Sequence, residues 1–187
     1  MRFTETPLPG AWLVASEPHR DERGYFARLR CSGEFAEYGL PAGFVQTNLS
    51  FNRQEGTFRG LHFQRPPSRE GKLVRCLAGA VHDVIVDLRP DSPAFLQHFW
   101  AELTADEPVA LFVPTGFAHG FLTATDGALV LYEMTDYYQP ELGDGIRWDD
   151  PALGIRLPGD IDAIHPRDRD YPDLDVAVLK CFAGWGL

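Results

Sequence analysis

The amino-acid sequence predicts an all-β protein in which short strands form a sandwich or barrel. Short runs rich in Val, Ile, Leu, Phe and Tyr recur between clusters of Gly, Pro, Asn and Asp, which is typical of strands separated by turns. A sustained period of about 3.6 residues, the mark of an amphipathic helix, is nearly absent. Because the chain has 187 residues and 44% of them are hydrophobic, we expect one domain over residues 1–187 with a well-buried core.

Ten strands are expected in chain order. They cover Trp12–Ala15, Tyr25–Arg30, Phe44–Asn52, Thr57–Gln64, Lys72–Leu77, Ala80–Leu88, Gln97–Leu103, Val109–Val113, His119–Thr123 and Ala128–Asp136. Between the last two strands, Asp126-Gly127 indicates a tight hairpin. Helices are expected only over Ser32–Tyr38 and Asp175–Lys180, and the Pro- and Asp-rich stretch Gln139–Pro172 is expected to be connection. A sandwich of this kind offers a ligand pocket between its sheets, so inward-pointing polar side chains become the candidates for function.

The charge balance limits the partners of the protein. Acidic side chains outnumber basic ones by 27 to 17, which gives a formal net charge of -10. Such a molecule repels polyanions, so binding of nucleic acid is not expected. A ligand that carries phosphate would need a local cluster of Arg, Lys and backbone N–H groups.

Cysteine spacing and hydropathy indicate the compartment. The three cysteines, Cys31, Cys76 and Cys181, include no CxxC pair, so neither a disulfide framework nor a thiolate zinc site is expected. The first residues lack the apolar segment of a secretory signal, and no stretch approaches the roughly 20 apolar residues of a membrane span. We therefore expect a cytoplasmic protein with no membrane partner.

Two of the six histidines lie in unusual surroundings. His62 lies in FRGLHFQ, where a period of two places Phe58, Gly60, His62 and Gln64 on one face, and His119 lies beside a glycine in PTGFAHGF. Glycines of this kind allow a ligand to approach the backbone. Jelly-roll proteins that bind metal commonly present HxH followed by Glu, and this strand offers only one histidine. No metal site is therefore expected, and a metal-dependent cupin enzyme is kept as an alternative.

Three further polar residues lie within apolar strands: Arg59 in FRGLHFQ, Lys72 in KLVRCL and Tyr132 in ALVLYEMTD. A structural role is open for each, because long cations extend apolar stems over a sheet edge and a tyrosine can be a core aromatic. Together, however, a His, a Lys, a Tyr and a carboxylate suit proton transfer beside a carbonyl. The base removes a C–H proton, the cation stabilises the enolate oxygen and the phenol returns a proton from the other face. That chemistry is epimerisation, although the pattern alone does not identify the carboxylate among 27 acidic residues.

Eight ordered motifs run from about residue 8 to residue 172. They are DERGYF (21–26), QTNLSFN (46–52), FRGLHFQ (58–64), GKLVRCLAG (71–79), DVIVDLR (83–89), PTGFAHGF (114–121), LYEMTDYYQP (131–140) and GIRWDDPALGI (145–155). This set resembles the dTDP-4-dehydrorhamnose 3,5-epimerase family. The resemblance implies a cupin-type jelly roll with short peripheral helices, usually a homodimer, that epimerises a nucleotide-diphosphate sugar of the 4-keto-6-deoxy type and needs no metal or organic cofactor.

The resemblance also implies roles for individual residues. The catalytic ones are His62 as the base, Asp168 as its partner, Tyr132 as the proton donor on the opposite face and Lys72 as the cation at the C4 oxygen. The substrate-binding ones are Gln46, Asn48, Arg59 and His119 for the diphosphate and the sugar hydroxyls, and Arg23, Phe26 and Tyr138 for the nucleotide, with Phe26 supplied by the partner subunit.

Two arginines depart from the family pattern near the substrate. Arg28 stands where the family usually has Glu, and a strand over Tyr25–Arg30 would place it on the same face as Phe26, toward the nucleotide. Pairing with a nearby carboxylate and simple solvation are the alternatives for Arg28. Arg167 replaces the usual Lys beside Asp168 and is counted among the substrate-binding residues.

Other departures lie close to the expected proton-transfer residues. Glu133 replaces the usual Lys after Tyr132 and is expected to face away from it, His165 replaces a Ser, and the Glu that precedes GIRW in the family is absent, with Gly143 or Asp144 in its place. The alternatives that stay open are an epimerase of a variant sugar nucleotide acting at C3 only or C5 only, a ketoisomerase of the same fold and a sugar-nucleotide binder without activity.

Overall fold

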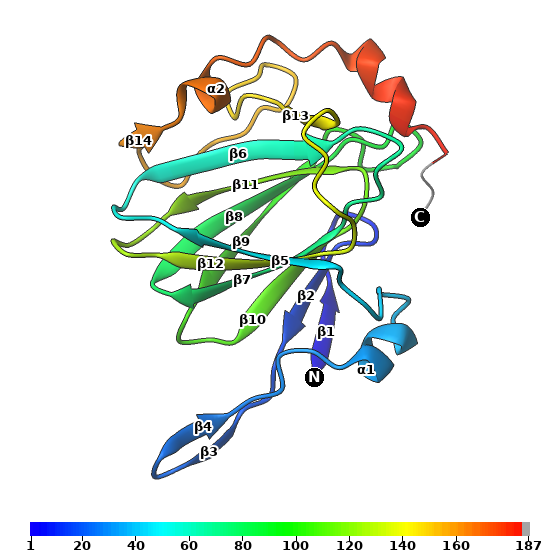
Figure 1. Ribbon diagram of the computed structural model, residues 1–187. Coiled ribbons are helices and arrows are strands. Elements are labelled where there is room, and N and C mark those ends of the chain that lie inside the picture. Colours follow the sequence, from blue (N-terminus) through cyan, green and yellow to red (C-terminus); the bar gives the residue numbers. More distant parts are fainter. Residues whose placement is uncertain (185–187) are drawn as a thin grey trace.

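Two sheets face each other in the computed structural model, which describes residues 1–184 (Figure 1). The first sheet has the order β1 (Arg2–Glu5), β2 (Trp12–Ala15), β10 (Val109–Val113), β7 (Lys72–Ala78), β12 (Leu129–Met134) and β5 (Gln46–Phe51). The second has the order β13 (Gly143–Gly145), β6 (Thr57–Gln64), β11 (Phe117–Thr123), β8 (Ala80–Asp87) and β9 (His98–Thr104), and β14 (Ala163–Ile164) pairs with β6. The successive strands β9, β10, β11 and β12 alternate between the two sheets. This connectivity confirms the expected all-β jelly roll.

The core lies between the two sheets. Strand alternation turns Val74 and Val130 of the first sheet toward Ile85 and Phe121 of the second, and all four side chains are buried. Burial of each such side chain stabilises the fold by roughly 1.5–3 kcal/mol. Polar residues that share these inward faces therefore lie at the edge of an apolar core, where water is largely excluded.

The outer face of each sheet is also covered. Helix α1 (Ser32–Glu37) packs Phe35 against the first sheet, and the C-terminal segments pack Phe182 and Leu153 against the second. These C-terminal segments include α2 (Pro166–Arg169) and the 3₁₀-helix η1 (Val176–Phe182), which lie above β6 in Figure 1. The C-terminal segments thus bring α2 next to the strand that carries His62.

The hairpin of β3 (His19–Asp21) and β4 (Gly24–Phe26) projects away from the sandwich (Figure 1). Its Phe26 side chain is 74% exposed. The predicted strand Tyr25–Arg30 is wrong beyond Phe26, because the ladder with β3 ends at the pair His19–Phe26. Arg28 lies outside the strand, so strand alternation does not place it on the same face as Phe26. Its Nη1 lies 2.9 Å from Glu34 Oε1.

The other nine predicted strands are present, three with the predicted bounds (Trp12–Ala15, Thr57–Gln64 and Val109–Val113) and six with shifted ends, and the first helix is present but ends one residue earlier. The C-terminal helix is a 3₁₀-helix, and the expected connection contains the short elements β13, β14 and α2. The turn at Gly127 forms with a φ of +68°, but the predicted hairpin is wrong because β11 and β12 lie in opposite sheets. The last three residues of the expected domain 1–187 lie outside the described residues. Between residues 1 and 184, no helix is long and apolar enough to cross a membrane.

Candidate active site

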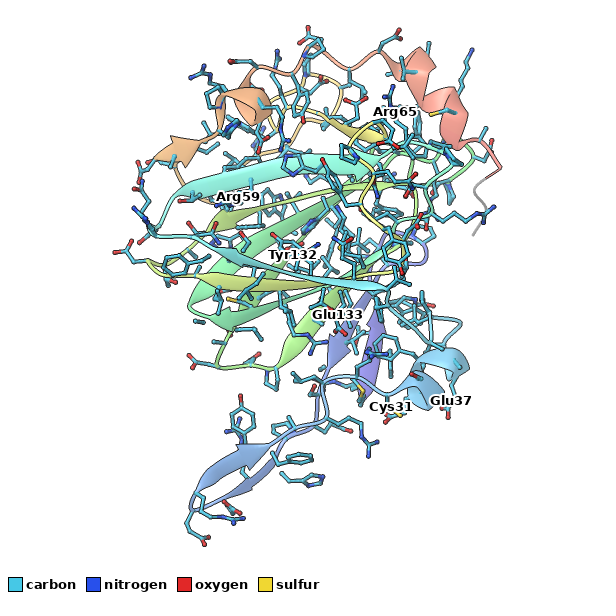
Figure 2. The ribbon with its side chains drawn as sticks, in the orientation of Figure 1. Cys31, Glu37, Arg59, Arg65, Tyr132 and Glu133 are labelled. Carbon is cyan, nitrogen blue, oxygen red and sulfur yellow. The ribbon has the colours of Figure 1, made fainter. Side chains whose placement is uncertain are left out.

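A pocket of about 610 Å³ opens between the sheets at the edge of the core. It is lined by Asn48, Ser50, Arg59, His62, Phe63, Gln64, Glu70, Lys72, His119, Phe121, Tyr132, Met134, Tyr138, Pro140, Gly143, Asp144, Arg167 and Tyr171. Figure 2 shows Arg59 and Tyr132 in the space between β6 and β12. The pocket therefore gathers most of the candidate residues from strands of both sheets.

A bulge in β6 determines which of its side chains reach the pocket. Against β11, His62 pairs with His119 and Arg59 pairs with Phe121, so β6 has one residue more than its partner over this interval. Arg59 and His62 both line the pocket, whereas Phe58 and Leu61 pack in the outer core. The predicted common face of Phe58 and His62 is therefore wrong.

Two glycines permit the close approach of β6 and β11 at this bulge. Gly60 has a φ of +130°, and a Cβ atom on it would lie 2.5 Å from the Cα of Gly120. A side chain at residue 60 would push the strands apart and move His62.

His62 and Asp168 form the most tightly connected pair of the site. The distance from His62 Nε2 to Asp168 Oδ1 is 2.9 Å, and Asp168 Oδ2 accepts a hydrogen bond from Gly60 N at 3.2 Å. Asp168 reaches this position on α2, which starts with Pro166 and is capped by the side chain of His165, which accepts from Arg167 N. Burial alone would raise the pKa of Asp168, but the hydrogen bonds from His62, Gly60 and Arg167 outweigh it and lower the pKa to about 2. The Asp168 carboxylate is therefore ionised at neutral pH.

His62 is kept neutral by its surroundings. Burial lowers its pKa below 6.5, and the cations of Lys72 and Arg167 lower it further against the opposing effect of Asp168. Arg167 Nε donates to Asp168 Oδ1 at 3.1 Å, and its Nη2 lies 3.1 Å from His62 Nε2. When the Nε2–H donates to Asp168, the other ring nitrogen, Nδ1, holds a lone pair and can take a proton.

Tyr132 faces this pair from the opposite sheet. Its ring packs edge-on against His119, with 5.8 Å between the ring centroids, and burial raises the pKa of its phenol above the usual value near 10. The Asp83 carboxylate raises the pKa further, although the Ser50 hydroxyl and Arg59 oppose this. The phenol is thus protonated at neutral pH and able to donate.

Lys72 forms the cationic end of the pocket. Its Nζ lies 3.1 Å from Glu70 Oε1, and both side chains are nearly buried. Gln64 Nε2 donates to the other Glu70 oxygen at 2.8 Å. The carboxylate of Glu70 therefore compensates the lysine charge until a ligand oxygen approaches.

His119 and Asp83 form a second pair of a histidine and a carboxylate, which is more deeply buried than His62 and Asp168. His119 Nε2 is 2.9 Å from Asp83 Oδ2, and both residues are buried. Within residues 1–184, Asp83 Oδ1 has no hydrogen-bond partner. On the neighbouring strand, Arg59 Nε donates to Asn52 Oδ1 at 2.7 Å, which fixes the guanidinium at the pocket wall.

The structure brings together nine of the thirteen sequence-predicted site residues. Asn48, Arg59, His62, Lys72, His119, Tyr132, Tyr138 and Arg167 line the pocket, and Asp168 contacts His62 behind it. Gln46 lies beside the wall, where its amide donates to Asn48 Oδ1 and accepts from Tyr138 N. Arg23 and Phe26 lie on the projecting hairpin, and Arg28 lies near it in a separate hollow with Phe26 and Glu34.

Glu133 faces away from the pocket, as expected. In Figure 2 it lies on the other side of β12 from the space that holds Tyr132. Its carboxylate pairs with Arg30 at 3.2 Å and with Arg75 at 3.5 Å. This departure from the family pattern therefore acts on the outer face of the first sheet.

Sequence reasoning missed Ser50, Glu70, Asp83 and Tyr171. Asp83 stands in the motif DVIVDLR and Glu70 directly precedes GKLVRCLAG, but nothing in their spacing distinguishes a pocket carboxylate from a surface one. Among the described residues, no group of three His, Cys, Asp or Glu side chains is arranged to hold a metal ion.

The comparisons with known proteins agree with one another. The sequence model of the dTDP-4-dehydrorhamnose 3,5-epimerase family matches residues 5–175. The dTDP-4-dehydrorhamnose 3,5-epimerase of Methanothermobacter thermautotrophicus is 42% identical over 176 residues, which cover 92% of this chain and 94% of that protein.

Two solved structures are similar to this fold. The dTDP-4-dehydrorhamnose 3,5-epimerase of Bacillus anthracis, with TDP and PPi bound, is 38% identical at a TM-score of 0.87 and is covered over 99% of its length by 92% of this chain. A 3′-monoepimerase from Streptomyces bikiniensis, in complex with dTDP-quinovose, is 29% identical at a TM-score of 0.86, with 96% of this chain and 92% of that chain covered.

Proposed function

Because the chain belongs to the dTDP-4-dehydrorhamnose 3,5-epimerase family, we propose that this isomerase inverts carbons beside the ketone of a dTDP-linked 4-keto-6-deoxyhexose. One observation carries the proposal: a neutral imidazole paired with a carboxylate and a protonated phenol face one pocket from opposite sheets. Inversion needs a base on one side of a carbon and an acid on the other.

The first step is removal of a proton. His62 takes the proton of C5 or C3, the C–H electron pair forms a carbon–carbon double bond to C4, and the carbonyl electrons move to the oxygen. Lys72 stabilises the enolate oxygen that results. Asp168 stabilises the imidazolium and fixes the ring orientation, as a carboxylate does in other histidine pairs.

The second step returns a proton on the other face. Tyr132 donates its hydroxyl proton to the same carbon, the ketone re-forms and the centre is inverted. His62 then loses its proton to solvent and Tyr132 regains one, so the protein returns to its starting state. No redox change occurs and the atoms balance without a cofactor.

The remaining pocket residues bind the substrate in this proposal. Arg59 and Arg167 supply donors for the diphosphate, which charge-assisted hydrogen bonds of roughly 1.5–3 kcal/mol each can hold despite the acidic remainder of the chain. His119, Gln46 and Asn48 contact sugar hydroxyls and diphosphate oxygens. Tyr138 at the pocket wall contacts the nucleoside.

We further propose a homodimer of single-domain subunits. Arg23 and Phe26 lie on the hairpin that projects from the body, and the large exposed fraction of Phe26 leaves this ring available to another subunit. In the dimer, each hairpin would deliver Arg23 and Phe26 to the nucleotide in the neighbouring pocket.

Inversion at a single carbon is the second candidate. It is favoured by the similarity to a 3′-monoepimerase, and the same base and donor serve both reactions.

Incubation of dTDP-4-keto-6-deoxyglucose with the protein in D₂O separates these possibilities. Proton NMR should show deuterium at C3 and C5 for the double epimerase and at one carbon for a mono-epimerase. Absence of exchange at both carbons, with the UDP, CDP and GDP analogues equally inert, would contradict the proposed function.

A further inference from the structure

Tyr171 lines the pocket but belongs to none of the eight sequence motifs. It follows α2 in the chain, and its ring lies against strand β13, which also lines the pocket. A Cβ atom on Gly145 would lie 2.4 Å from Tyr171 Cε2 and Cζ. The ring therefore fills the space that a side chain at residue 145 would take.

Tyr138 lies in van der Waals contact with the same strand. A Cβ atom on Gly143 would lie 3.4 Å from Tyr138 Oη and 3.6 Å from its Cε2. Residues 143 and 145 are two apart on a strand and so share a face. The two tyrosine rings are thus laid over neighbouring glycines, and together they make one side of the pocket aromatic.

The backbone of Tyr171 is hydrogen-bonded to the segment that follows β13. Its carbonyl oxygen accepts a hydrogen bond from Arg147 Nη1 at 3.4 Å. The same guanidinium is paired with Asp149 at 3.0 Å and with Asp173 at 2.8 Å. These contacts anchor the segment after α2 to the strand end that follows β13.

Tyr171 lines the pocket and carries a protonated hydroxyl. Burial raises its pKa, and although Arg167 opposes this, the carboxylates of Asp168 and Asp144 add to it, so the phenol is protonated. Within residues 1–184 this hydroxyl has no hydrogen-bond partner, and the Arg167 side chain beside it is 58% exposed. Flat aromatic faces next to an accessible guanidinium match a ligand that joins an aromatic ring to a diphosphate.

We propose that Tyr171 is a nucleotide-binding residue, which together with Tyr138 forms an aromatic wall for the nucleoside while Arg167 faces the diphosphate. This inference rests on the proposed function, because it assumes a nucleotide in this pocket. Stacking on an aromatic side chain typically changes affinity for a base by about 5- to 150-fold. The ring, rather than the hydroxyl, is expected to supply most of that effect.

Isothermal titration with dTDP and with inorganic pyrophosphate tests the proposal. Tyr171→Ala should weaken dTDP binding by about tenfold or more and leave pyrophosphate binding within about twofold. Tyr171→Phe, which keeps the ring, should retain nearly all of the dTDP affinity. Tyr137→Ala is the matched control, because Tyr137 is 63% exposed and does not line the pocket; its dTDP affinity should equal that of the wild type.

Gly145→Ala provides a second route, since its methyl group would displace the Tyr171 ring without removing it. This variant should also lose dTDP affinity while keeping pyrophosphate affinity. Wild-type dTDP affinity in Tyr171→Ala, or an equal loss for both ligands, would overturn the inference. Failure of the wild-type protein itself to bind dTDP would contradict the proposed function, and the inference about Tyr171 would then be wrong as well.

Discussion

His62 and Asp168 stand 106 residues apart in the chain, yet 2.9 Å separates Nε2 of one from Oδ1 of the other. The pairing depends on two local features. The bulge in β6 turns His62 into the pocket, and the cap and proline of α2 set Asp168 beneath it. A base and its carboxylate are thereby fixed before any ligand arrives.

Replacing His62 by Ala should lower the epimerisation rate by roughly 10²–10⁴, the usual contribution of a positioned base. Turnover of dTDP-4-keto-6-deoxyglucose, followed by NMR, checks this. Asp168→Asn should also reduce the rate, because the amide neither stabilises the imidazolium nor fixes the same tautomer. Asp170→Asn, at the exposed C-cap of α2, is the control and should retain wild-type activity.

The acidic limb of the pH–rate profile should move when Arg167 is changed. Activity needs neutral His62, and burial, Lys72 and Arg167 lower the pKa of this imidazole, so activity should fall as the pH drops through the lowered pKa. Asp168, with a pKa of about 2, stays ionised over this range. Arg167→Gln removes one cation that opposes the imidazolium, so the pKa of His62 rises and the limb shifts to higher pH.

Two variants complete the pH experiment. Arg167→Lys keeps a positive charge and should leave the limb close to its wild-type position. Arg65→Gln removes an exposed cation that pairs with Asp144 at 3.7 Å, outside contact with His62, and should not move it. An unchanged limb in Arg167→Gln would show that the guanidinium does not act on the base.

Prolonged treatment with a chelator should leave turnover unchanged, because Lys72 supplies the positive charge at the enolate oxygen. Lys72→Met, which keeps much of the length and none of the charge, should then abolish most activity. Activity that is lost to the chelator and restored by zinc, iron or manganese would assign the enolate to a metal instead.

The sequence predicts the strands far better than it predicts their faces. Alternation places Lys72 and Tyr132 correctly, because β7 and β12 are regular where these residues lie. It fails for Phe58, since a bulge resets the period within β6. It fails for Arg28 because its strand ends two residues earlier, and Arg28 pairs with Glu34 instead.

The carboxylates of the site could not be identified from local sequence patterns. Asp168 follows from the resemblance and not from spacing, since it lies in a Pro- and Asp-rich segment with little periodicity. Glu70 and Asp83 gain their significance only from burial beside Lys72 and His119. Contacts between distant strands create these environments, and no local pattern encodes them.

In the proposed mechanism, His62 removes a proton on one face of the carbon and Tyr132 returns one on the other. Its most direct test is Tyr132→Phe, incubated with dTDP-4-keto-6-deoxyglucose in D₂O and followed by proton NMR. Deuterium should still enter beside the ketone, because His62 can remove and return protons, while inverted product should be lost almost completely. Inversion at the wild-type rate in this variant would contradict it.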